Sequence, residues 1–278
     1  MRILSSCLCL WAATQLLSGC GGGSGDGPAT PSSAANPNAS SLNQESNSEG
    51  FTKLTAAGLQ RGFGHSASDL SETARASGGV AAADYDGDGD IDLYVVGGDS
   101  DPNSLYENQG DGTFVDVASE LGVDFTHWGS GPVFGDIDGD GDLDLFIGAV
   151  EGDPYYVLEN RAGIFIDITH SSGIRLTSPN TFSATFYDYD RDGYLDLFLS
   201  HWGTNRSPGD DTETVWRNQG NSSFVASSIE TGIAKALIEQ NTDWSYTQNF
   251  SDIDGDGDGD LLVTSDFGES QVFINNDD

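Results

Sequence analysis

The stretch that decides the fold is Asp84-Tyr85-Asp86-Gly87-Asp88-Gly89-Asp90-Ile91-Asp92. The same pattern, D-x-D-x-D-G-x-x-D, occurs three more times along the chain. The further copies run from Asp136 to Asp144, from Asp188 to Asp196 and from Asp252 to Asp260. Because all four copies keep a glycine at the sixth position, we interpret them as one repeated loop rather than as chance acidic runs.

The spacing of the acidic residues predicts that each loop binds one Ca²⁺. Carboxylates at the first, third and fifth positions can converge on a hard cation when the sixth-position glycine permits a sharp turn. The seventh position offers its backbone carbonyl, and the ninth returns a carboxylate. The alternative is a solvated acidic loop without metal, in which these like charges repel at neutral pH. The predicted ligands are Asp84, Asp86, Asp88, Asp90, Asp92, Asp136, Asp138, Asp140, Asp142, Asp144, Asp188, Asp190, Asp192, Tyr194, Asp196, Asp252, Asp254, Asp256, Asp258 and Asp260.

An EF-hand loop is the nearest alternative, and the sequence argues against it. That loop needs a bidentate glutamate at the twelfth position and a helix on each side. The residues at this position are apolar here: Val95, Ile147, Leu199 and Val263. The segments after the loops, such as Leu93–Val96, are apolar and rich in residues that favour strands. The loops are therefore predicted to join buried strands.

The composition is that of an acidic globular protein. The chain has 278 residues, 36% of them hydrophobic, which is enough for a sizeable core. The net charge of −35 comes from 45 acidic and 10 basic residues, and the four loops hold 19 of the acidic ones. So negative a surface excludes nucleic acid as a partner. The 37 glycines and many aromatic residues are typical of a turn-rich all-β protein.

The N-terminus resembles the leader of a bacterial lipoprotein. Met1 and Arg2 precede the apolar segment 3–17, which is too short to span a membrane comfortably. The segment ends in Leu-Ser-Gly-Cys at Cys20, which resembles a lipobox. We expect residues 1–19 to be a signal peptide, Cys20 to be acylated, and residues 20–50 to form a flexible Gly/Ser/Ala/Pro/Asn tether. The expected location is the outer membrane or cell surface; an ordinary secretory signal is the alternative.

The remainder of the chain repeats in phase with the loops. The loops start at residues 84, 136, 188 and 252, which gives intervals of 52, 52 and 64 residues. A further motif recurs after each loop, for example in the segments 105–110 and 215–220, both of which contain Asn-Gln-Gly. Each unit therefore indicates four strands in about 50 residues, as in the blade of a β-propeller. The longer third unit is expected to carry loop insertions near 201–211 and 234–241, the second with a short helical turn.

The repeated loops, together with Asn-Gln-Gly-Asp-Gly-Thr-Phe at 108–114, resemble the FG-GAP/VCBS repeats of integrin-α-type β-propellers. The resemblance covers residues 51–278 as four repeat units. It implies an all-β propeller or partial propeller with calcium in the four loops, and a scaffold that binds other molecules. Residues 50–54 resemble the last strand of a unit and the fourth unit lacks that strand, so pairing of the two ends would close a ring. The alternative is that the chain is an incomplete part of a larger propeller, since relatives usually have more blades.

Two His-Trp pairs are the candidate ligand-binding residues outside the loops. They are His127-Trp128 and His201-Trp202. They could form a stacking platform for a sugar, although aromatic residues in phase with a repeat more often pack between blades. No catalytic triad, zinc signature or phosphate-binding loop is present. The sequence thus predicts an adhesion or binding scaffold for an extracellular protein or glycan; the alternatives are a calcium-dependent, lyase-like polysaccharide enzyme and a purely structural array.

Overall fold

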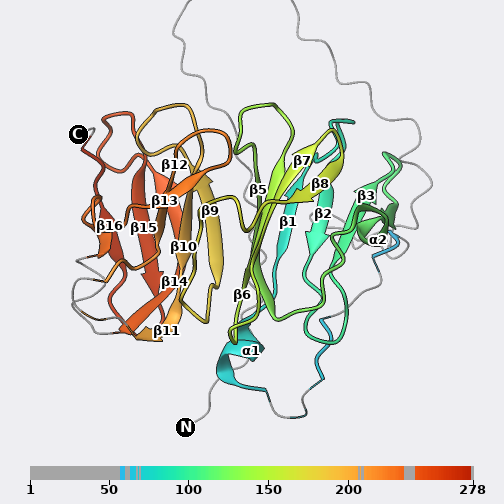
Figure 1. The fold of residues 1–278 in the computed structure, drawn as a ribbon, viewed down its shortest axis with the longest axis horizontal. Helices are drawn as coiled ribbons and strands as arrows, with labels where there is room; N and C mark the ends of the chain where they lie inside the picture. Colours follow the sequence, from blue (N-terminus) through green and yellow to red (C-terminus); the bar gives the residue numbers. More distant parts are fainter. Residues whose placement is uncertain are drawn as a thin grey trace, which may run out of the picture.

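The structure is a computed structural model that describes residues 57–59, 63–66, 68, 70–205, 207, 210–234 and 242–276. The strands form four four-stranded antiparallel sheets (Figure 1). The prediction of an all-β array of propeller-type blades is confirmed. None of the helices in the described ranges is both long enough and apolar enough to cross a membrane.

Each sheet is one blade. Blade 1 contains β1 (Val80–Ala83), β2 (Asp92–Val95), β3 (Ser104–Asn108) and β4 (Phe114–Asp116). Blade 2 contains β5 (Gly129–Gly135), β6 (Asp144–Ala149), β7 (Tyr156–Arg161) and β8 (Ile164–Asp167). Blade 3 contains β9 (Ser183–Tyr187), β10 (Asp196–Ser200), β12 (Val215–Asn218) and β13 (Phe224–Ala226). Blade 4 contains β14 (Thr242–Ser251), β15 (Asp260–Ser265), β16 (Gln271–Phe273) and the added strand β11 (Trp202–Asn205).

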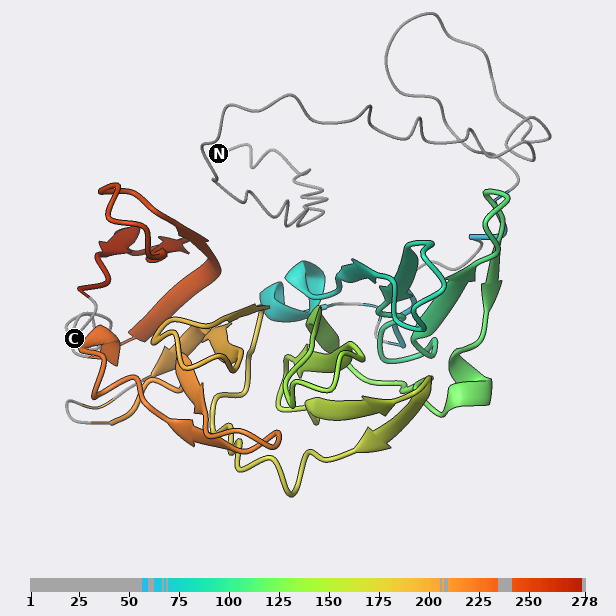
Figure 2. The ribbon, with the colours of Figure 1, turned by 90° about the horizontal axis from the view of Figure 1, so that it is seen from above.

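The blades stand side by side around a common inner edge. The first strands of successive blades contact one another, β1 with β5, β5 with β9 and β9 with β14. In blades 1 to 3 the later strands follow outward in chain order. Seen from above, the four blades lie along an open arc (Figure 2). The described chain is therefore a partial propeller.

The core lies between neighbouring blades, on the strands that follow the loops. All six residues of β6 and all five of β10 are buried, as expected of strands that are covered on both faces. Tyr94 and Leu145 belong to the cluster between blades 1 and 2. Phe146 and Leu197 belong to the next cluster, and a third joins blades 3 and 4. The burial of this apolar surface holds the array together.

The two expected insertions in the third unit have different outcomes. Within the first, Trp202–Asn205 forms β11 and pairs antiparallel with β14, with Thr204 opposite Asp243. The insertion thus adds a strand to the inner edge of blade 4 rather than forming only a loop. Most of the second insertion, residues 235–241, lies outside the described residues. The structure also contains two short helices that the sequence did not predict, α1 (Glu72–Ala76) and α2 (Ala118–Leu121).

The expected spare strand at residues 50–54 lies outside the described residues, but the chain just after it contacts blade 1. The carbonyl of Ala57 accepts a hydrogen bond from the N–H of Phe114 at 2.8 Å. In blade 3, the carbonyl of Ser172 accepts from the N–H of Phe224 at 2.7 Å. Ala57 therefore bonds the outer strand of blade 1 in the same way that Ser172, which follows blade 2, bonds the outer strand of blade 3.

Each blade has an asparagine near or just after the end of its third strand, which we call the clamp asparagine; in blades 2 to 4 it joins the blade to the one before it. Its Nδ2 donates to the carbonyl of the second loop residue in the preceding blade, which ties one loop to the next. The three bonds run from Asn160 to Tyr85 at 2.9 Å, from Asn218 to Ile137 at 2.8 Å and from Asn275 to Tyr189 at 2.9 Å. Covered in this way, Ile137 is only 1% exposed, whereas its equivalent in blade 4, Ile253, is 48% exposed.

We predict that Asn218→Ala lowers the free energy of unfolding by about 1–3 kcal/mol more than Asn108→Ala, because only the former leaves the buried carbonyl of Ile137 without its donor. Asn108 is a matched control: it lies in the same Asn-Gln-Gly turn, its Nδ2 donates within its own blade to Ile91, and no preceding blade is among the described residues. Urea unfolding followed by tryptophan fluorescence measures both losses. Equal losses of unfolding free energy in the two variants would contradict the proposal that the bond to Ile137 stabilises the contact between blades.

Candidate metal centres

The sixth-position glycine turns each loop back onto its first aspartate. The φ angles of Gly89, Gly141, Gly193 and Gly257 lie between 93° and 98°, a region that residues with a Cβ atom rarely adopt. In this conformation the glycine N–H donates to the first-position carboxylate at 2.9, 3.0, 3.0 and 3.2 Å in loops one to four. The turn therefore fixes the first carboxylate over the loop.

Three carboxylates converge in every loop, from the first, third and ninth positions. In each group the three oxygen atoms lie within 4.8 Å of one another. Oxygen donors of this kind, charged and closely spaced, are the ligands that Ca²⁺ prefers. The groups are Asp84, Asp86 and Asp92; Asp136, Asp138 and Asp144; Asp188, Asp190 and Asp196; and Asp252, Asp254 and Asp260.

The fifth and seventh positions are engaged with each other. The fifth-position carboxylate accepts from the seventh-position N–H, for example Asp88 from Asp90 at 2.8 Å and Asp192 from Tyr194 at 3.0 Å. The same bond occurs in the second and fourth loops. The structure thus brings together the carboxylates of the first, third and ninth predicted ligand positions, while the fifth-position carboxylate accepts a hydrogen bond within the turn.

The ninth-position aspartate ties the loop to the rest of its blade. One carboxylate oxygen accepts from the N–H of the second loop residue and the other from the N–H of the clamp asparagine. In blade 2, Asp144 accepts from Ile137 and from Asn160, both at 2.7 Å. The equivalent bonds join Asp92 to Tyr85 and Asn108, Asp196 to Tyr189 and Asn218, and Asp260 to Ile253 and Asn275. All four carboxylates are buried.

Burial makes the negative charge of these carboxylates costly. Desolvation raises the pKa of Asp92 to about 6 and those of Asp144 and Asp196 to about 7, and nearby loop carboxylates add to the shift. In Asp260 the two backbone N–H bonds dominate and lower the pKa. In the first three loops, protons therefore compete with a cation up to nearly neutral pH, and a bound cation would favour the charged form.

The residue before the clamp asparagine differs between blades and changes the charge beside the cluster. It is Glu107 in blade 1 and Glu159 in blade 2, and their charges contribute to raising the pKa values of Asp86 and Asp138. In blade 3 it is Arg217, whose Nε lies 2.7 Å from Asp190 Oδ2. The donor set of the third loop fits a divalent cation less well than those of the first two loops, because it already holds a positive charge.

Neither predicted histidine reaches solvent. His127 is 3% exposed, and its ring nitrogens lie 3.2 Å from Asn103 Nδ2 and 3.0 Å from the carbonyl of Pro154. His201 is fully buried, with a ring nitrogen 3.0 Å from the carbonyl of Glu213. Direct contact between a dissolved ligand and either imidazole would require a blade to open.

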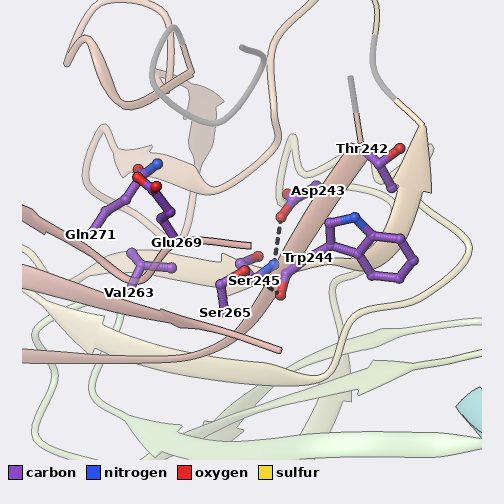
Figure 3. A pocket seen from close by; sticks show the side chains of 8 residues that line it. All are labelled: Thr242, Asp243, Trp244, Ser245, Val263, Ser265, Glu269 and Gln271. Atoms are coloured by element: carbon purple, nitrogen blue, oxygen red, sulfur yellow. Dashed lines mark hydrogen bonds between the residues drawn. The ribbon is translucent and has the colours of Figure 1, made fainter. Parts of the chain in front are cut away.

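The predicted tryptophans lie apart from each other and are half-buried. Trp128, which directly precedes β5 of blade 2, packs against Phe63, with ring centroids 6.0 Å apart. Trp202 packs edge-on against Trp244 at 5.4 Å. A cavity of about 10 Å³ beside Trp244 has room for about one water molecule. Figure 3 shows Asp243 on its wall, where the carboxylate accepts from Ser245 N at 2.8 Å.

Comparison with known proteins agrees with this geometry. Residues 84–147 match the family model of the FG-GAP-like repeat, a region that contains the first two loops. The chain is 28% identical over 174 residues to cartilage acidic protein 1 of Xenopus tropicalis and 28% identical over 173 residues to that of Mus musculus. Each alignment covers 62% of this chain and 26% of the relative, so the match spans about a quarter of the relatives' length.

Two solved structures also align with the chain. A lectin from Agrocybe aegerita, described as recognising non-reducing terminal N-acetylglucosamine, has a TM-score of 0.38 and 20% identity, covering 70% of this chain and 52% of its own. The V. cholerae biofilm matrix protein Bap1 has a TM-score of 0.36 and 18% identity, covering 66% of this chain and 23% of its own.

We predict that Arg217→Glu raises the Ca²⁺ affinity of the third loop roughly tenfold, because it replaces a positive charge beside a partly exposed cluster with the residue that the first two blades carry. The reciprocal change, Glu107→Arg, should weaken the first loop. Calorimetric titration with Ca²⁺ measures both effects. If neither change alters binding, the charge before the clamp asparagine has no influence on these loops.

Proposed function

We propose that this chain is an exported, lipid-anchored binding scaffold whose blades are held in shape by Ca²⁺ in the four loops. One observation carries the proposal: the same three-carboxylate cluster recurs in every blade, each anchored by a ninth-position aspartate that also bonds the clamp asparagine. Loading a loop would stabilise its blade and, through the clamp, the blade that follows. When bound, Ca²⁺ supplies charge neutralisation and cross-linking.

The proposed location and attachment rest on the leader. Residues 1–19, Cys20 and the tether at 20–50 all lie outside the described residues, so the support for acylation is the lipobox alone. An exterior position also suits calcium loops, since extracellular calcium modules work at Kd values on the order of 10⁻⁴ to 10⁻³ M. The partner we propose is an extracellular protein or glycan.

The proposed binding role is supported by the burial of the two predicted histidines and by the acidic surface. Within the described ranges, both predicted histidines are buried and hydrogen-bonded to protein groups. A general base must reach the proton that it abstracts. These contacts favour a scaffold over the lyase-like alternative, and the acidic surface favours a partner without strong negative charge.

Cell fractionation combined with ligand capture tests the proposal. The chain should lie in the membrane fraction, and Cys20→Ala should move it to the soluble fraction. Arrays of extracellular proteins and glycans should show specific capture in Ca²⁺, which is lost with chelator and weakened in Asp138→Asn but not in Asp116→Asn, an acidic control outside the loops. Capture that chelator leaves unchanged would contradict the calcium role, and release of cleaved glycan would favour the enzyme.

A further inference from the structure

A groove of about 260 Å³ lies beside the outer strands of blade 2, and none of the residues that line it belongs to a calcium loop or to a His-Trp pair. It runs between the residues that lead into β7 and those that follow β8. Its walls are Pro154, Tyr155, Tyr156, Asp167, Thr169 and His170. Nothing in the calcium scaffold uses these side chains, so the groove needs an explanation of its own.

Tyr156, one of the groove walls, packs against two other rings. The ring of Tyr156 stacks on Phe125, with centroids 3.8 Å apart and planes at 13°, and meets the edge of His127 at 5.3 Å. His127 in turn bonds the carbonyl of Pro154, which forms another wall. The buried histidine thus positions both the tyrosine and the groove wall. A site with fixed walls loses little conformational entropy when a ligand binds.

Three polar groups of the groove are free to bind a ligand. The hydroxyl of Tyr156 and the imidazole of His170 have no hydrogen-bond partner in the described part of the chain, and Asp167 uses one oxygen to accept from Thr169 N at 2.9 Å. Burial and the nearby charges of Asp167 and Asp153 raise the pKa of Tyr156, so the phenol stays a donor. The groove therefore offers both donors and acceptors.

The tyrosine pair is absent from the equivalent place in blade 1. Tyr156 pairs with Ile147 across the sheet, and the residue in the same place in blade 1 is Ser104, which pairs with Val95. The repeat therefore folds without a tyrosine at this position. Asp167, in contrast, has an equivalent in Asp116 at the end of β4. The aromatic wall is thus specific to blade 2.

We propose that this groove binds one ring of a neutral glycan, an inference that rests on the proposed binding function and names its site. Sugar hydroxyls both donate and accept, which matches a phenol, an imidazole and a carboxylate placed around aromatic walls. The volume suits a single ring rather than a long chain. Weak binding of one ring is sufficient when many copies of a surface protein bind the same polymer, because multivalent binding raises the overall affinity.

Other ligand classes fit less well. An anion would face Asp167 and a chain of net charge −35. A cation would leave the phenol and imidazole donors unused and would lie near Arg175, which donates to the carbonyl of His170 at 2.8 Å. A purely apolar ligand would bury the carboxylate without a partner, which is costly. The neutral polyhydroxyl ring is the class that satisfies every group.

Saturation-transfer NMR on the full calcium-loaded chain tests the groove, with the methyl glycosides of glucose, galactose, mannose and N-acetylglucosamine as probes. At least one should bind, and Tyr156→Phe, which keeps the stacked ring, should weaken it about 2- to 12-fold through the lost hydrogen bond. Asp167→Asn should also weaken it, whereas the matched control Asp116→Asn should not. Thermal unfolding checks that every variant is folded.

Two results would contradict glycan binding by the groove. Either none of the four glycosides binds, or the one that binds does so as tightly to Tyr156→Phe, Asp167→Asn and His170→Ala as to the unchanged chain. Failure here is distinguishable from failure of the proposed function. Calcium-dependent capture by a chain whose groove binds no glycoside would leave the scaffold standing with its site elsewhere. Glycoside binding that persists unchanged in chelator would support the groove and contradict the calcium role.

Discussion

The structure depends on the hydrogen-bonded node between the ninth-position aspartate and the clamp asparagine. In blade 2, Asp144 belongs to the carboxylate cluster and accepts hydrogen bonds from the backbone N–H groups of Ile137 and Asn160. The same Asn160 donates to the carbonyl of Tyr85 in the preceding loop. One pair of residues therefore links a loop, its blade and the neighbouring blade: the backbone N–H of Asn160 bonds Asp144, and its side chain bonds the preceding loop.

The node also explains why a bound cation would stabilise the array. It places a carboxylate in a buried site among others of the same charge, and desolvation then raises the pKa of Asp144 to about 7. Without metal, the folded chain binds protons that the unfolded chain has released, so its stability falls as the pH rises from about 4 towards 7. A bound Ca²⁺ would offset this cost, because it binds the charged form of the carboxylates. Arg217 supplies part of that charge in the third loop.

Much of the fold and of the metal centres could be predicted from local pattern. The D-x-D-x-D-G-x-x-D loops, the apolar strands after them and the asparagine near the end of the third strand all repeat in phase, so the pattern predicts the blades and the carboxylate clusters. What the sequence could not show depends on contacts between distant residues. Strand β11 pairs across an insertion with β14. The clamp joins residues 75 positions apart, Asn160 and Tyr85. Burial of His127 follows from packing against Tyr156.

The most direct measurement is thermal unfolding of the chain in 10 mM Ca²⁺ and in excess chelator. With Kd values on the order of 10⁻⁴ to 10⁻³ M, each occupied loop should add about 1.4 to 2.7 kcal/mol to the free energy of unfolding. We expect a clear rise in melting temperature with Ca²⁺, reduced stepwise as Asp86 and then Asp138 are changed to Asn. A chain that is well folded in chelator and melts at the same temperature in calcium would contradict it.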